Sequence, residues 1–196
     1  MKQLKSQGLI VIAALAVMAS VATASASATT LKLGSVTQST QVSVVATLEA
    51  GTSMLLKDGS GTTADTCSSS EIKGSTSSSS GVSVTAAVSV LSFTGCTHTT
   101  KVTSRGTLHI EWINGTDQGL LISSGAAFTY VSTAFGISTT CETATGTVLG
   151  TLTGKTGTSE HATIDINSKV LCPGFGTVTW TASYIVTSPT GLSVTS

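Results

Sequence analysis

The sequence predicts an all-β protein that folds as an antiparallel β-sandwich. Three observations support this prediction. Beyond the N-terminal region, apolar residues recur at every second position and not with the period of a helix. Threonine and valine, which favour strands, alternate with stretches of serine and glycine, which favour turns. Four cysteines give the even number that is typical of an exported, disulfide-bonded domain.

The N-terminal region predicts a signal peptide. Lys2 and Lys5 precede an uncharged apolar run over residues 9–21, and small residues with Ala-x-Ala spacing follow it. A run of roughly 13 apolar residues is shorter than the ~20 that cross a bilayer as a helix. We therefore expect cleavage near Ala26 or Ala28.

Cleavage there divides the chain into a signal peptide, residues 1–28, and a single secreted domain, residues 29–196. No second stretch has membrane length, no cysteine follows the apolar run as a lipid-attachment site, and residues at the C-terminus form no sorting tail. The expected location is extracellular, with no membrane attachment after cleavage.

The charge balance argues against nucleic acid as a partner. Without Lys2 and Lys5, seven basic groups remain against nine acidic ones, and Arg105 is the only arginine. Phosphate binding needs clustered lysine and arginine side chains, and this chain has no such cluster.

The first half of the domain contains three predicted strands. Residues 42–48 place Val42, Val44, Ala46 and Leu48 on one face, and residues 54–57 form a second, shorter strand. The third strand, residues 82–93, changes phase within one apolar run, which predicts a β-bulge near Val90. The serine-rich residues 68–81 are predicted to form a flexible loop.

The second half begins with a predicted hairpin. Leu108, Ile110 and Trp112 share one face of a strand, and Asn114-Gly115 supplies a turn to residues 119–123, because both residues tolerate positive φ. Further strands follow at residues 127–132, 146–152, 162–170 and 178–186.

The last of these strands alternates strictly, with apolar side chains on one face and hydroxyl groups on the other. Such alternation indicates one buried face and one wet face. Many short strands without helices favour a sandwich, with Greek-key or immunoglobulin-like connections, over a closed sheet.

The cysteines allow the three connectivities that any set of four permits. We favour Cys67–Cys96 and Cys141–Cys172, because each bond closes a loop of about 30 residues within one apparent unit of strands. The similar spacing suggests two pseudo-repeated halves, residues 29–100 and 101–196. No Cys-x-x-Cys or nearby histidine pair is present, so neither a metal site nor a cofactor is expected.

Motifs of nucleophilic catalysis are absent from the sequence, which contains no Gly-x-Ser-x-Gly elbow. His109 and Glu111 share the outer face of one predicted strand, and His161 and Asp165 share that of another, while His98 follows a third. A hydrolase requires at least two of these side chains to converge on a nucleophile or metal. A solvated outer face explains them without catalysis.

Aromatic residues fall into two groups. Trp112, Trp180 and Tyr184 are in phase with buried aliphatic residues and are predicted to pack in the core. Phe135 and Phe175 lie beside glycines in predicted loops, and they are the candidates for exposed binding contacts.

Several segments resemble those of uncharacterised secreted proteins of high-GC Gram-positive bacteria. The segments are residues 179–192, 91–96, 150–154 and 171–173, and the likeness extends over residues 62–194. The resemblance implies secretion and a β-rich fold, and it implies no activity.

The expected function is therefore non-enzymatic. The leading hypothesis is a secreted or cell-surface β-protein with a structural or interaction role that includes self-assembly, because residues 82–93 and 178–186 carry few charges against edge pairing. The alternative is an extracellular module that binds a small molecule or a carbohydrate. A secreted hydrolase is the third hypothesis.

Overall fold

The computed structural model describes residues 28–131, 136–155 and 159–196. Within these ranges every regular element is a strand and all pairings are antiparallel, so the predicted all-β class is confirmed. The predicted signal peptide lies almost entirely outside the described residues. In the described part of the chain, no helix has the length and apolar character needed to cross a membrane. The strands are β1 (Thr29–Leu33), β2 (Val36–Thr37), β3 (Ser43–Leu48), β4 (Met54–Lys57), β5 (Thr63–Thr76), β6 (Ser80–Gly81), β7 (Val84–Cys96), β8 (Lys101–Trp112), β9 (Gln118–Val131), β10 (Ser138–Glu142), β11 (Thr147–Thr153), β12 (Thr163–Cys172), β13 (Gly176–Ser188) and β14 (Leu192–Thr195).

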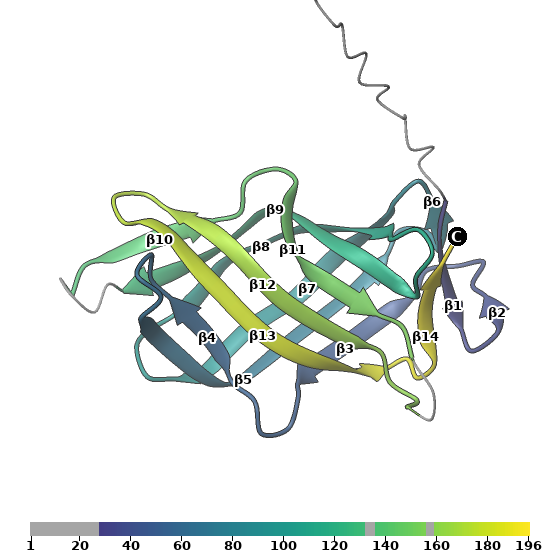
Figure 1. The fold of residues 1–196 in the computed structure, drawn as a ribbon, viewed down its shortest axis with the longest axis horizontal. Coiled ribbons are helices and arrows are strands. Elements are labelled where there is room, and N and C mark those ends of the chain that lie inside the picture. Colours follow the sequence, from purple (N-terminus) through teal and green to yellow (C-terminus); the bar gives the residue numbers. More distant parts are fainter. Residues whose placement is uncertain (1–27, 132–135, 156–158) are drawn as a thin grey trace, which may run out of the picture.

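The larger sheet closes on itself. Its strand order is β10-β12-β11-β9-β8-β7-β5-β3-β13-β4. An additional pairing of β12 with β13 closes the sheet into a ring that runs from β12 to β13. The short strand β4 pairs with both β13 and β5, and β3 pairs with the same two strands further along their length. Strand β10 pairs with both β9 and β12. The two layers of the predicted sandwich are thus joined along both sides, and the molecule is elongated along them (Figure 1).

The smaller sheet lies at one end of the larger one. It has the order β14-β1-β2, and β6 also pairs with β1 (Figure 1). The Thr29 hydroxyl group of β1 donates a hydrogen bond to the Val82 carbonyl and accepts one from the Trp112 amide of β8. Leu31 and Leu192 of this sheet are fully buried, so the small sheet closes that end of the interior.

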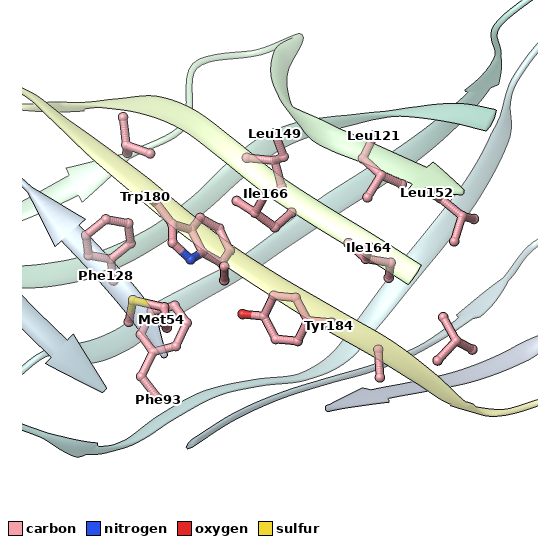
Figure 2. Close-up of a cluster of buried hydrophobic side chains, with 14 of the residues drawn as sticks. Met54, Phe93, Leu121, Phe128, Leu149, Leu152, Ile164, Ile166, Trp180 and Tyr184 are labelled. Atoms are coloured by element: carbon pink, nitrogen blue, oxygen red, sulfur yellow. The ribbon is translucent and has the colours of Figure 1, made fainter. Parts of the chain in front are cut away.

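The interior contains an aromatic cluster around Trp180 of β13. Its ring contacts Phe93 edge to face at 5.6 Å between centroids, and Phe128 at 6.4 Å (Figure 2). Tyr184 lies on the same face of β13, and its hydroxyl group is 2.8 Å from that of the buried Ser70. Burying such a side chain contributes about 1.5–3 kcal/mol. The predicted alternation of β13 and the core positions of Trp180 and Tyr184 are confirmed.

Two local predictions for the strands are also confirmed. The β8–β9 connection contains Asn114-Gly115, with φ of +78° at Gly115, and the Ile113 amide donates to the Gln118 carbonyl at 2.9 Å. In β7, Val90 lies opposite Lys73 but Val88 lies opposite Gly74, so one extra residue forms a bulge beside Val90.

The prediction of a flexible loop over residues 68–81 is wrong. Most of this segment belongs to β5, which pairs with β3 and β4 on one edge and with β7 on the other. Pairing on both edges satisfies its backbone, and the buried Ser70 hydroxyl finds its partner in Tyr184. The serine-rich composition therefore did not prevent a central strand.

Both predicted disulfides are confirmed. Cys67 and Cys96 lie directly opposite each other on β5 and β7, while Cys141 and Cys172 join β10 to β12. Each bond connects strands of one predicted half. The two halves are not equivalent in pairing, because β5 and β7 form a long ladder whereas β10 and β12 share one pair, Glu142 and Leu171.

Candidate functional site

The closed sheet is interrupted between β7 and β8. The ladder between these strands joins Val84–Ala87 to Thr107–Ile110 and ends there. Beyond it, residues 88–95 of β7 and residues 101–106 of β8 face each other without pairing, although their other edges pair with β5 and β9. We call the space between these two segments the β7/β8 slot.

Two glycines explain why β8 leaves β7 at this point. Gly106 of β8 and Gly125 of β9 lie at the same level of their hairpin, with φ of +64° and +72°. Positive φ is accessible to glycine at little cost and bends the strand sharply. A further irregularity follows between Val102 and Ser104. The first part of β8 therefore follows β9 away from β7.

The same glycine pair changes which side chains face the interior. On β9, Leu121 and Ser123 are buried before Gly125, whereas Ala126, Ala127 and Phe128 are buried after it, and of the two alanines Ala126 lines the interior cavity. Arg105 lies directly opposite Ala126, and residues directly opposite each other on antiparallel strands share a face. Arg105 is thus turned toward the interior side of the sheet, at the edge of the slot.

A groove and two small cavities meet at the slot. The groove has a volume of about 460 Å³ and is lined by Val88 and Leu91 of β7 and by residues 102–105 of β8. A cavity of about 40 Å³ lies behind it, and Val88, Leu91 and Arg105 line both spaces. The deeper wall of this cavity includes Leu149, Ile166 and Trp180.

The second cavity, of about 50 Å³, lies toward the small sheet and includes Leu31 and Leu192 in its lining. It shares five residues with the first cavity, which are Ile72, Val88, Leu108, Leu121 and Ile164. Several of these inward-facing side chains are only half-buried, among them Ile72, Val88 and Leu108. The slot thus gives solvent access to part of the apolar interior.

The electrostatics of the groove depend on one side chain. Arg105 is exposed, and no other residue lining the groove is charged. Among the described residues Lys73 and Glu71 form an ion pair at 3.0 Å, and the His98 ring lies 3.9 Å from the Asp65 carboxylate. The Arg105 guanidinium therefore has no carboxylate partner within 4.0 Å in the described part of the protein.

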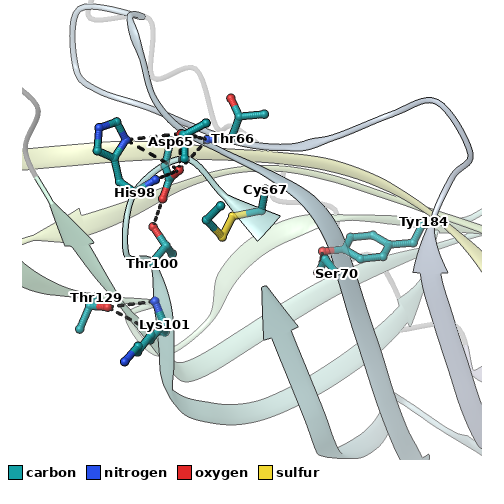
Figure 3. Close-up of a disulfide and its surroundings, with 11 residues drawn as sticks. Asp65, Thr66, Cys67, Ser70, His98, Thr100, Lys101, Thr129 and Tyr184 are labelled. Carbon is teal, nitrogen blue, oxygen red and sulfur yellow. Dashed lines mark hydrogen bonds and ion pairs between the residues drawn. A yellow bond between two sulfur atoms is a disulfide. The ribbon is translucent and has the colours of Figure 1, made fainter. Parts of the chain in front are cut away.

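Asp65 fixes the far end of the slot, where β7 turns into β8. Its buried carboxylate accepts hydrogen bonds from the hydroxyl groups of Thr97 and Thr100 and from the backbone amides of Thr66 and His98 (Figure 3). Burial alone raises the pKa of this carboxyl, but the hydrogen bonds, led by that of Thr100, outweigh it, and the pKa is lowered. The turn is thus tied to β5.

The same carboxylate lies within 4.8 Å of the sulfur atoms of Cys67 and Cys96, the one cluster of metal-ligand type found among the described residues. Both sulfur atoms belong to the disulfide, so they are not available as thiolate ligands. This cluster therefore serves as an anchor of the turn.

Replacing Asp65 by asparagine is expected to cost about 1–3 kcal/mol at neutral pH, because an amide cannot accept all four hydrogen bonds. The carboxyl pKa is lower in the folded state than the unfolded value of about 3.9, so this contribution is complete above that value and is lost as the pH falls below it. Urea unfolding at pH 7 and pH 3 should show the difference between D65N and wild type shrinking in acid. The exposed Asp117, replaced in the same way, is the control. An unchanged difference at pH 3 would contradict the role of the charge.

The residues predicted as binding contacts lie elsewhere. Phe135 is outside the described residues. Phe175 is half-buried in the turn between β12 and β13 and packs edge to face on Tyr130, with 6.4 Å between ring centroids. It belongs to the edge of the core and does not line the slot.

The polar residues considered for catalysis do not share one site, although His109 and Glu111 both lie on β8. His109 of β8 contacts the Thr85 hydroxyl group, and His161 contacts the Val186 carbonyl at 2.8 Å. Glu111 lies on β8 and Asp165 on β12, and β9 and β11 separate these strands in the sheet. His98 lies in the turn beside Asp65. The pair on β8 is therefore not beside Asp165, and these side chains do not form the convergent group that a hydrolase requires.

Comparison with known proteins adds no further assignment. No family model, no curated protein and no solved structure matches the chain. The fold and the slot are therefore interpreted from their own geometry. Sequence reasoning did not identify the slot, and the available signal was the glycine pair, with Gly106 ahead of the predicted strand of Leu108 and Gly125 between two predicted strands.

Proposed function

We propose that the protein is a non-enzymatic extracellular binding module that accepts an apolar group of a small ligand through the β7/β8 slot. One observation carries the proposal: a groove of about 460 Å³ opens between unpaired strand edges onto an apolar cavity. This volume lies within the range of about 300–1,000 Å³ that is typical of ligand sites.

The sizes of the three spaces indicate how a ligand would be divided among them. The cavities, of about 40 and 50 Å³, hold only the end of a chain or part of a ring. The groove holds the body of the ligand, where backbone groups of the unpaired edges of β7 and β8 are available as donors and acceptors. A slender molecule with one apolar end fits this arrangement.

The lining favours a hydrocarbon group over a sugar. Aliphatic side chains such as Leu121, Leu149 and Ile164 dominate the cavity, and Trp180 contributes to its wall from within the core. An exposed aromatic ring that could stack on a sugar is missing from the described residues that line the groove, whose polar side chains are those of Thr103, Ser104 and Arg105.

Self-association remains a separate prediction, which rests on the few charges that residues 82–93 and 178–186 carry against edge pairing. Most of β13 pairs with β12 on one edge and with β3 or β4 on the other. In β7, only the segment along the slot has an unpaired edge. Edge pairing between copies therefore has less support than ligand binding.

Filling the cavity by replacing Ala126 with valine, which adds two carbon atoms, is expected to weaken binding of 1-octanol at least tenfold, since even one extra methylene group in an apolar pocket has an effect of about this order. The measurement is a titration followed by the indole N–H signals in NMR spectra. Trp180 lines the cavity, whereas the Trp112 indole donates to the Thr116 carbonyl outside it and serves as an internal reference.

Ala182 supplies the matched control, because it is buried on β13 but lines neither cavity. A182V should retain octanol binding while losing about 1–3 kcal/mol of stability through overpacking. Absence of an octanol-dependent shift at Trp180 in wild type, or equal binding by wild type and A126V, would overturn the proposal.

A further inference from the structure

We infer that the ligand carries an anionic head group, and that Arg105 pairs with this group at the edge of the slot. The inference rests on the proposed function and adds the chemical class of the ligand: an anionic amphiphile, with its apolar end in the cavity and its carboxylate or similar group in the groove. Three observations support it.

The first observation is the direction of the Arg105 side chain. Regular alternation from Leu108 and Ile110 would turn this residue outward, but it lies opposite the buried Ala126 and lines the cavity as well as the groove. Its side chain therefore extends from the interior side of the sheet, while the residue as a whole is exposed. This is the arrangement in which a long side chain covers apolar surface with its stem and keeps its charge in water.

The second observation is the absence of a partner for that charge. No carboxylate lies within 4.0 Å of the Arg105 guanidinium among the described residues, and the remaining lining of the groove is uncharged. A guanidinium group binds carboxylates with two parallel hydrogen bonds. Arg105 is also the only arginine of a chain that is otherwise poor in charge.

The third observation is that a charge for the head group and an apolar opening for the hydrocarbon end lie next to each other. Val88 and Leu91 are shared by groove and cavity, as Arg105 is, so the charge and the apolar opening border the same space. A bound molecule can thus place a head group at Arg105 and a hydrocarbon end beyond Val88 without crossing a polar barrier.

The test compares octanoate with 1-octanol, which differ in the head group and share the length of the chain. In R105Q, octanoate binding near neutral pH should weaken about fivefold, and octanol binding should not change. R105K keeps a charge and should restore part of the octanoate affinity. K169Q removes an exposed charge on β12, away from the slot, and should leave both affinities unchanged. Added salt should weaken only octanoate binding.

The outcomes separate the inference from the function on which it rests. If R105Q weakens both ligands equally, or neither, or if wild type binds octanol and not octanoate, the anionic head group is excluded and the binding function stands. If neither ligand shifts the Trp180 indole signal of wild type, both proposals fail. Loss of octanoate binding alone in R105Q supports both.

Discussion

Replacing Gly106 by alanine is expected to destabilise the protein by about 3–5 kcal/mol. The residue has φ of +64°, and holding a non-glycine residue there costs of order 1–3 kcal/mol. An added Cβ would also lie 2.4 Å from the Ala126 nitrogen and 2.5 Å from the Ser124 oxygen. Both are backbone atoms of β9, so relief of the clash requires β8 and β9 to separate.

The measurement is the free energy of unfolding in urea, with G115A as the matched control. Gly115 has φ of +78° but nothing within 4 Å of an added Cβ, so G115A should show the backbone cost alone, of order 1–3 kcal/mol. The additional loss of unfolding free energy in G106A, compared with G115A, measures the effect of the close approach of β8 and β9. If G106A and G115A lose equal stability, the hairpin relaxes without cost and the explanation of the slot is wrong.

Part of β8 also explains why the slot was not predicted from the sequence. Val102, Leu108 and Ile110 all occupy even positions, so the strand looks regular. The strand contains two irregularities, one at Gly106 and one between Val102 and Ser104. The first changes which side chains face the interior, and the second changes them back, so Val102 faces inward like Leu108 and Ile110. Between the two irregularities, the side chain of Arg105 lies on the opposite side of the sheet from the one that regular alternation predicts. A single polar residue gives no periodic signal in the sequence.

On β9 the phase change was visible and was interpreted differently. Apolar residues move from Leu121 to Phe128 and Tyr130, with Ser123, Ser124 and Gly125 between them, which favours a turn between two strands. The structure instead continues one strand through Gly125, because β8 pairs along one edge, while β11 pairs with residues 118–123 and β10 with residues 127–131 on the other edge. Local propensity cannot report such pairing.

Features that depend on local pattern were predicted well. The strict alternation of β13, the Asn114-Gly115 turn and the bulge beside Val90 followed from residues near each other in sequence, and both disulfides followed from the spacing of the cysteines along the chain. Closure of the sheet through β12 and β13, and its interruption between β7 and β8, depend on long-range neighbours. The candidate site arises from the second kind of feature, so it became visible only in the fold.

Removing the Cys67–Cys96 disulfide by a double alanine substitution is expected to cost about 3–4 kcal/mol, the loss that loop closure over a separation of 29 residues predicts. The bond also holds β7 against β5 beside the end of the slot, next to the Asp65 anchor. The slot should therefore become less well ordered, and octanol binding should weaken in the variant that remains folded.

Removing the Cys141–Cys172 bond provides the comparison, because its separation of 31 residues predicts nearly the same loss of stability. This bond joins β10 to β12, and neither of these strands borders the slot between β7 and β8. Urea unfolding should therefore place the two variants close together, while the titration with octanol separates them. If both variants bind octanol as wild type does, the pairing of β5 with β7 is sufficient to order the slot without the disulfide. If both lose binding equally, the effect follows global stability and not the position of the bond beside the slot.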